Sequence, residues 1–188
     1  MNRKVPEIRF DGFTEEWVLR KLGEMVERIT RKNKNLQSIR ALTISAQYGL
    51  VDQNDFFSKQ VASRDVAGYY LIQKGEFAYN KSYSNGYPLG AIKRLDLYPD
   101  GVLSTLYIVF RPMEINSDFL ASYYDTSKWY KEVSKYASEG ARNHGLLNIT
   151  ANDFLKTVLK TPVSDREQKK SVHSSSNSTI SLHFISVS

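Results

Sequence analysis

The loop at residues 80–90 gathers side chains whose types and spacing suit contact with DNA. It reads NKSYSNGYPLG, so a lysine, hydroxyls and amides stand where glycine and proline interrupt regular structure. Basic side chains neutralise phosphates and set register, whereas amides and hydroxyls can meet base edges in the major groove. From this loop and the residues that follow it, we expect DNA contacts by Lys81, Tyr83, Ser84, Asn85, Lys93 and Arg94.

A second loop, bracketed by Gly140 and Gly145, carries three more polar side chains: Arg142, Asn143 and His144. The geometry of bidentate pairing favours Arg142 for guanine and an asparagine for adenine. A second group of expected contacts is spread along the chain: Arg40, Gln47 and Lys59. For each of these residues, ordinary surface charge or loop capping is the alternative interpretation.

The composition is that of a soluble globular domain with an excess of positive charge. The 188 residues are 41% hydrophobic and 24% charged, and the formal net charge is +6. This balance favours a polyanionic partner such as double-stranded DNA. The absence of cysteine excludes disulfides and cysteine-ligated metal sites and fits the reducing cytoplasm. No apolar run is long enough to predict a signal peptide or a membrane span.

The sequence lacks the motifs of enzymes that act on DNA. It has neither the glycine-rich cofactor loop and Asn/Asp-Pro-Pro-aromatic motif of a methyltransferase nor the P-loop of an ATPase. We therefore expect no catalysis, no cofactor and no metal. The enzymatic alternative is a small nuclease built around Asp165, Glu167 and Lys169, in which carboxylates bind magnesium and the lysine activates water. Three charged residues that open a helix are more often a solvated face.

We predict one α+β domain over residues 1–165, with a central β region and flanking helices, followed at 166–188 by the start of a helix and an irregular tail. Apolar residues at helical spacing predict a first helix over residues 14–30. The remaining patterns predict strands at 41–45, 69–79, 88–95 and 102–111, and helices that begin at Asn116 or Ser117 and at Thr150. The pair Asp100-Gly101 predicts a tight hairpin between the last two of these strands.

The composition changes abruptly after Lys170. Residues 171–188 hold eight serines and no Asp, Glu, Lys or Arg, and they show no sustained helical period. We expect an irregular tail there, or a weak strand over residues 180–187.

Several segments together resemble a target recognition domain of the specificity subunit (HsdS) of type I restriction-modification systems. They are VPEIRF at 5–10 with Gly12, Phe13 and Trp17, GEFAYNK at 75–81, GYPLGAIKRL at 86–95, and Pro162 followed by Glu167 and Gln168. The resemblance covers about residues 5–170. It implies a mixed α/β domain that reads one half of a bipartite DNA target without catalysis of its own. It also implies two kinds of partner, a methyltransferase (modification) subunit and an ATP-dependent restriction subunit.

The chain departs from that family after Lys170, where a serine-rich tail replaces the long spacer helix of these subunits. Such subunits usually hold two recognition domains, and their paired helices dock the methyltransferase, whereas this chain has one recognition domain. The sequence leaves docking open, and a homodimer would need a surface other than that helix. An inert truncated product of a silent gene cassette is a further alternative.

Overall fold

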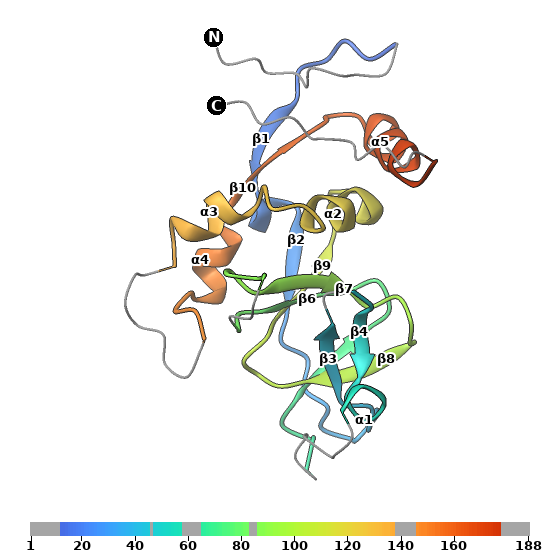
Figure 1. The fold of residues 1–188 in the computed structure, drawn as a ribbon, viewed down its shortest axis with the longest axis vertical. Coiled ribbons are helices and arrows are strands. Elements are labelled where there is room, and N and C mark those ends of the chain that lie inside the picture. The colour runs from blue at the N-terminus through green and yellow to red at the C-terminus, as the bar shows by residue number, and fades with distance from the viewer. Residues whose placement is uncertain (1–11, 46, 58–64, 83–85, 138–145, 178–188) are drawn as a thin grey trace.

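The centre of the fold is a four-stranded antiparallel sheet with the strand order β2-β9-β6-β7 (Figure 1). The computed structural model describes residues 12–45, 47–57, 65–82, 86–137 and 146–177. The strands of this sheet are β2 (Val26–Ile29), β9 (Ile108–Pro112), β6 (Phe77–Asn80) and β7 (Ala91–Arg94). Because Val26 lies opposite Pro112 and Phe77 opposite Phe110, the sheet joins segments far apart in the sequence.

Three two-stranded antiparallel sheets surround this centre. They are β3 (Leu42–Ser45) with β4 (Gly49–Asp52), β5 (Tyr70–Gln73) with β8 (Asp100–Leu103), and β1 (Val18–Lys21) with β10 (Val158–Thr161). The first two lie below the central sheet in Figure 1, near the short helix α1 (Gln53–Phe56), and the β1-β10 ribbon rises at the opposite end. The 3-10 turn η1 (Leu22–Glu24) joins β1 to β2.

The larger helices lie on the side of the sheet that faces the β1-β10 ribbon (Figure 1). They are α2 (Ser117–Tyr124), α3 (Tyr130–Ser134), α4 (Ala151–Leu155) and α5 (Asp165–Asn177). Asn116 caps α2, since its side chain accepts from the backbone N–H groups of Asp118 and Phe119. Thr150 caps α4 by accepting from the N–H of Asp153 at 3.1 Å. The predicted starts of both helices are therefore confirmed.

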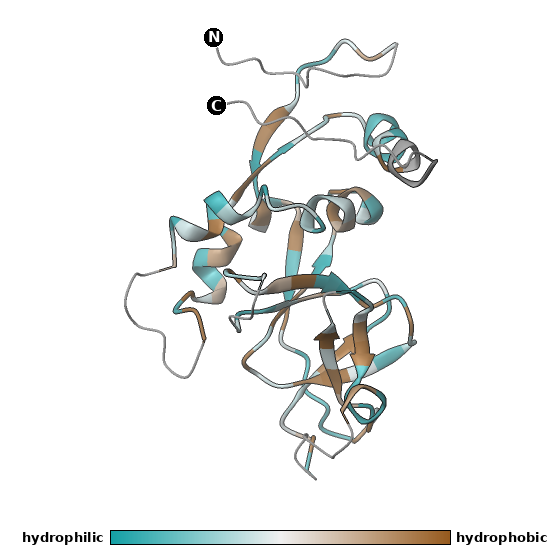
Figure 2. Cartoon of the chain, in the orientation of Figure 1, coloured by the Kyte–Doolittle hydropathy of each residue, from teal (hydrophilic) through white to brown (hydrophobic). Residues whose placement is uncertain are grey.

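The core divides into two main clusters because successive residues of a strand point to opposite faces. Phe77 and Tyr79 face the helices, where the rings of Tyr79 and Phe154 lie 4.8 Å apart. Ala78 and Val109 face the other way, into a cluster with residues of β3, β4, β5 and β8. Figure 2 shows apolar residues on the strands of both regions. The central sheet is thus buried on two sides.

The predicted helix at residues 14–30 is wrong, because this segment forms β1, η1 and β2. Four of the five apolar residues of the predicted pattern nevertheless belong to the core, namely Leu22, Met25, Val26 and Ile29, whereas the fifth, Val18, is 38% exposed. The turn between the two strands packs Gly23 so closely against α4 that a Cβ there would lie 3.2 Å from the Leu155 carbonyl oxygen. Pairing of β1 and β2 with distant strands overrides the local helical spacing.

The predicted hairpin at Asp100-Gly101 is also wrong. Both residues lie inside β8, which pairs with β5, so that Asp100 is opposite Gln73. The segment expected to be one strand at 102–111 is divided between β8 and β9, which belong to different sheets. Gly101 is required for space, because a Cβ there would lie 2.4 Å from Leu42 Cδ1.

The C-terminal part contains more regular structure than we expected. The strand β10 was not predicted, and α5 continues past Lys170 to Asn177. The irregular tail was expected over residues 171–188; it is wrong for 171–177, which belong to α5, and residues 178–188, with the weak strand expected there, lie outside the described residues. The α+β class is confirmed, with antiparallel sheets and separate helices. In the described ranges, no helix combines the length and the apolar character needed to cross a bilayer.

Candidate nucleic-acid interface

A β-bridge joins the two polar loops that the sequence singles out. Ser82 pairs antiparallel with Leu146, and the backbone N–H of Leu147 donates to the carbonyl oxygen of Lys81 at 3.0 Å. We call these four residues, Lys81, Ser82, Leu146 and Leu147, the loop junction. The first loop leaves the sheet at this junction and the second returns to it. Two segments more than sixty residues apart in the sequence therefore meet at one place, where the first loop begins and the second ends.

Seven of the predicted DNA contacts lie outside the described residues: Lys59, Tyr83, Ser84, Asn85, Arg142, Asn143 and His144. Their roles stay predictions. The described ends of the two loops, at 82 and 146, nevertheless lie side by side. The contacts expected from the two loops therefore originate at the same end of the central sheet.

Local hydrogen bonds hold the described part of the first loop. The backbone N–H of Ser82 donates to Asn80 Oδ1 at 3.0 Å, and the hydroxyl of Tyr79 donates to the carbonyl oxygen of Leu89 at 2.9 Å. Gly90 has a φ of 78°, and a Cβ there would lie 2.0 Å from the Asn80 carbonyl oxygen. Only glycine fits this approach, so the sequence requires a tight return from the loop to β7.

Lys81 lies in the loop junction itself. Its Nζ donates to the carbonyl oxygen of Ile149 at 3.3 Å, and burial lowers the pKa of its amine. The side chain thus ties the end of the second loop to the start of the first. A phosphate contact by Lys81 stays a prediction, and it would compete with this internal hydrogen bond.

Lys93 and Arg94, on β7, pair with carboxylates. Lys93 Nζ lies 2.6 Å from Asp125 Oδ1, and the Arg94 guanidinium lies 2.7 Å from both Asp96 and Asp118. Burial alone lowers the pKa of Arg94, but the hydrogen bonds and charges of Asp118 and Asp96 outweigh this effect and raise it. Arg94 therefore holds the start of α2 against β7. Phosphate contact by either cation stays a prediction.

Two hollows share the Lys93–Asp125 ion pair. The first has a volume of about 400 Å³ and is walled by aromatic side chains, namely Tyr87, Trp129 and Tyr130. The second, of about 310 Å³, includes Gln47, Tyr48 and Leu97. Because Tyr87 belongs to the first polar loop, the first hollow adjoins that loop. The structure thus brings Gln47, Lys93 and Arg94 to one surface.

Arg40 belongs to a different part of the molecule. Its guanidinium lies over the ring of Tyr98, 4.5 Å from the centroid, and 3.6 Å from a carboxylate oxygen of Asp52. It lines neither of the two hollows. The structure therefore separates Arg40 from the other described candidates.

Two polar residues, one at the shared surface and one next to a residue that lines it, were not predicted from the sequence. Asp125 pairs with Lys93, and Lys128 follows directly after Ser127, which lines the first hollow. Burial lowers the pKa of the Lys128 amine to about 8. Neither residue stands in a recognisable motif, because an aspartate or a lysine in a surface turn is common. They can be recognised as candidates only in the tertiary structure, where the connection between α2 and α3 lies beside β7.

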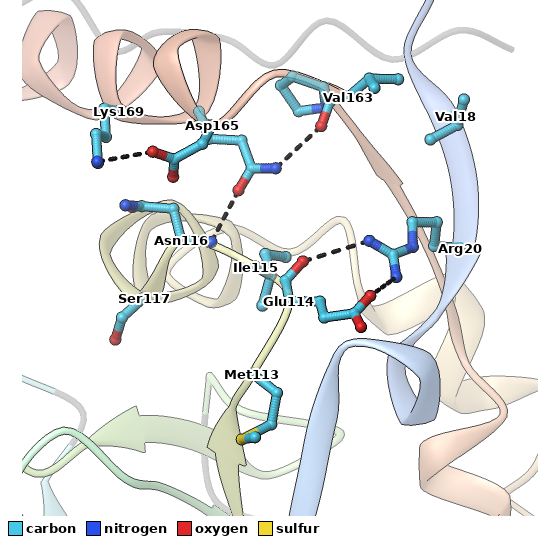
Figure 3. Close-up of a pocket in the computed structure, with 12 residues that line it drawn as sticks. Val18, Arg20, Met113, Glu114, Ile115, Asn116, Ser117, Val163, Asp165 and Lys169 are labelled. Carbon is cyan, nitrogen blue, oxygen red and sulfur yellow. Dashed lines mark hydrogen bonds and ion pairs between the residues drawn. The ribbon is translucent and has the colours of Figure 1, made fainter.

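A larger cavity, of about 510 Å³, lies where β1 and β10 meet the start of α2 and of α5 (Figure 3). Its charged side chains pair with one another. Arg20 contacts Glu114 at 2.8 Å, and Lys169 contacts Asp165 at 2.7 Å. This cavity is therefore part of the joint between α5 and the domain.

Two buried side chains fix α5 at this joint. Gln168 accepts from the backbone N–H of Asn116 at 2.8 Å and donates to the carbonyl oxygen of Pro162 at 3.0 Å. Glu167 accepts from the indole N–H of Trp17 at 2.9 Å. These contacts bring together residues from both ends of the chain that carried the family resemblance. The resemblance therefore has a structural basis in the attachment of α5.

The same contacts bear on the nuclease alternative. Glu167 is only 2% exposed and is bound to Trp17, whereas Asp165 and Lys169 form an exposed pair on α5. Within the described part of the chain, no three His, Asp or Glu side chains gather as metal ligands. The geometry gives the nuclease alternative no support.

Comparison with solved structures identifies the fold. The HsdS subunit from Thermoanaerobacter tengcongensis matches with a TM-score of 0.55 at 19% identity, over 85% of this chain and 41% of that chain. A chain from a structure of complex assembly and conformational transition in the type I R-M system matches with a TM-score of 0.58 at 16% identity, over the same shares. The chain thus spans less than half the length of these neighbours. No family model and no curated protein matches the sequence.

The class of fold is therefore that of type I specificity subunits, as the sequence resemblance implied. At identities of 16% and 19%, these structural matches establish the architecture alone. The recognition made from the segments at 5–17, 75–81, 86–95 and 162–168 is confirmed at this level. What the neighbours bind and assemble with becomes the basis of a proposal for this chain.

Proposed function

We propose that this chain is a sequence-specific DNA-binding domain that recognises one half of a bipartite target as the specificity component of a type I restriction-modification system. The observation that carries the proposal is the loop junction, which holds two polar, glycine-bounded loops at one end of an HsdS-type fold. Binding residues commonly stand on loops that a rigid scaffold positions. The net charge of +6 adds attraction to a polyanion.

Recognition in this proposal divides between two kinds of contact. Lysines and arginines neutralise phosphates and set the register of the domain on the duplex. Side chains of the two loops meet base edges in the major groove, with Arg142 on guanine and Asn85 or Asn143 on adenine. The chain changes no covalent bond of the DNA.

We further propose that partner subunits supply the chemistry. The neighbours include a chain from a structure of type I R-M system assembly, which supports the proposal that this chain works in a complex, with methyltransferase and restriction subunits as its partners. The cysteine-free sequence fits our proposal that this complex works in the cytoplasm. In this chain, α5 leaves the domain where the family places its spacer helix, and Trp17, Glu167 and Gln168 fix its start. This anchored helix is the element that we expect to face the partners.

Selection from a library of random DNA duplexes with the purified full chain tests the proposal. We expect one short motif to be enriched, with an affinity that falls steeply as salt rises. Arg142→Ala should cost about 1–3 kcal/mol on that motif and relax preference at one base pair. Lys74→Ala is a matched control, because Lys74 is exposed in the turn between β5 and β6, before the start of β6, whereas the loop junction follows the end of β6. Equal affinity for selected and scrambled duplexes, or magnesium-dependent cleavage of plasmid, would contradict the proposal.

A further inference from the structure

Asp125 stands where an acidic residue is electrostatically unfavourable. It follows the last residue of α2, at the end of the helix where the dipole is negative and favours cations. Its side chain is 60% exposed and lies beside the first polar loop, on the surface that carries Lys93 and Arg94, two of the cations for which we expect DNA contacts. A carboxylate there repels the phosphates that the neighbouring cations attract. Two electrostatic terms therefore oppose an acid at this position.

The fold gains little from Asp125 in return. Its carboxylate pairs with Lys93 Nζ at 2.6 Å, and because the carboxylate is 60% exposed and Lys93 22%, water screens much of what this ion pair contributes to stability. Its backbone N–H donates to the carbonyl oxygen of Ala121, a contact that most residue types can make. A residue that is unfavourable in its local setting and adds little to the stability of the fold is expected mainly at a functional site.

The ion pair offers a hydrogen-bond donor and an acceptor side by side. In the major groove, a G·C base pair presents guanine O6 and N7 as acceptors next to the N4 amino group of cytosine as a donor. A lysine suits the guanine acceptors, and an aspartate suits the cytosine amino group. Because Lys93 Nζ and Asp125 Oδ1 are only 2.6 Å apart, both can reach the edge of one base pair.

We propose that Lys93 and Asp125 together read one G·C base pair, with Lys93 on guanine, in place of the phosphate contact expected from the sequence, and Asp125 on cytosine. This inference rests on the proposed DNA-binding function and names the base pair that one part of the site takes. Asp125 determines the specificity, because a cation at a phosphate contributes equally to every sequence, whereas a carboxylate at a base edge accepts only from an amino group. The hollow that the pair shares with Tyr87 leaves the ion pair accessible from the surface.

The test compares the motifs that the wild-type chain and Asp125→Asn select from one library of random duplexes. An asparagine has the same size but presents an amide, which pairs in bidentate fashion with N6 and N7 of adenine. We expect one G·C position of the wild-type motif to change to A·T, while the other positions stay unchanged. On the wild-type motif, Asp125→Asn should bind about tenfold more weakly, which corresponds to the loss of one base contact. Asp125→Glu keeps the acceptor and should keep the G·C preference.

Glu114→Gln is the matched control. It removes the same charge from another exposed ion pair, that with Arg20 beside α5. Removal of a negative charge strengthens binding to all duplexes alike, so Glu114→Gln should leave the selected motif unchanged. If the wild-type chain selects a motif that Asp125→Asn reproduces at every position, the base-pair inference is overturned and the proposed function stands. If the wild-type chain selects no motif, the proposed function fails and the inference fails with it.

Discussion

A single side chain, Lys128, shows how burial affects charge next to the proposed interface. Burial lowers the pKa of its amine from the ordinary 10.5 to about 8. The folded protein therefore binds the proton less tightly than the unfolded chain does. The cost of keeping this amine protonated in the fold is full below pH 8 and fades as the pH rises from 8 toward 10.5.

Replacing Lys128 with methionine should therefore stabilise the protein in a pH-dependent way. We expect Lys128→Met to raise the midpoint of thermal unfolding at pH 7, and to raise it less at pH 9.5, where the wild-type amine is largely neutral. Calorimetric melting at the two pH values measures this difference. Lys131→Met, at an exposed position of α3, is the control and should shift neither midpoint. An equal gain for Lys128→Met at both pH values would show that its charge is not the cause.

Asp125 is a second residue whose proposed role depends on its surroundings in the fold. The polar loops and cations in the sequence predict DNA contacts by basic and amide side chains, and they do not predict a contact by an acidic residue. Only the position of Asp125 at the end of α2, paired with Lys93 next to the first hollow, gives it significance. A residue that repels phosphates can still contribute to selectivity, because base edges include donors as well as acceptors.

At the scale of elements, the connection from β6 to β7 decides whether the loop junction forms. The connection returns through Gly90, which combines a positive φ with close contact to the Asn80 carbonyl oxygen. Tyr79 holds Leu89 from the core side. The first polar loop therefore closes on a rigid base.

Gly90→Ala should disrupt this base. We expect a loss of at least about 2 kcal/mol in the free energy of unfolding, because the added Cβ must displace backbone as well as adopt a strained φ. Gly86→Ala is the matched control, since Gly86 also has a positive φ, 81°, but an added Cβ would meet nothing within 4 Å. That variant should lose only about 1 kcal/mol. Urea denaturation of both variants measures the difference, and equal losses would contradict the role of Gly90.

At the scale of the whole molecule, exposed apolar side chains gather at the end that carries α5. They belong to β1, to the segment after β9 and to the segment after β10: Val18, Leu19, Met113 and Val163. Three of them, Val18, Met113 and Val163, also line the larger cavity (Figure 3). Clusters of this kind mark contact surfaces for other proteins. None of the four residues of the loop junction lines this cavity, so partner and DNA would meet different residues of the domain.

We expect the full chain to co-purify with the methyltransferase subunit of its own system. A double variant, Leu19→Glu with Val163→Glu, should reduce recovery of the complex, because it places charge on the apolar surface. Leu106→Glu is the control, since Leu106 is also exposed but lies in the turn between β8 and β9. Failure of the wild-type chain to co-purify would favour an inert truncated product. Light scattering of the complex would count the copies of this chain and so test the homodimer.

Much of the local structure can be predicted from the sequence where a local interaction decides it. The caps at Asn116 and Thr150 are confirmed, because a capping side chain bonds to backbone two or three residues away. Four apolar residues of segment 14–30, Leu22, Met25, Val26 and Ile29, are core residues, yet the predicted element is wrong. Hydrophobic spacing reports burial, and strands that pair with distant partners can bury the same residues.

The candidate site also has one part that can be predicted from local sequence and another that depends on contacts between distant residues. The polar loops at residues 80–90 and 140–145 can be recognised from composition, because glycine, proline and polar side chains favour loops in any context. Their meeting at Ser82 and Leu146 cannot, since it depends on a bridge between segments far apart in the chain. The pairing of Lys93 with Asp125 is hidden for the same reason.

The sequence by itself determined the α+β class, the basic charge, the loops rich in hydrogen-bonding groups and the resemblance to type I specificity subunits. These properties depend on composition and on neighbours along the chain. The tertiary structure alone decided that β8 pairs with β5, that α5 is anchored through Trp17, Glu167 and Gln168, and that the two loops share one base. Each of these outcomes is a contact between residues distant in sequence, and its free energy depends on how the whole core packs.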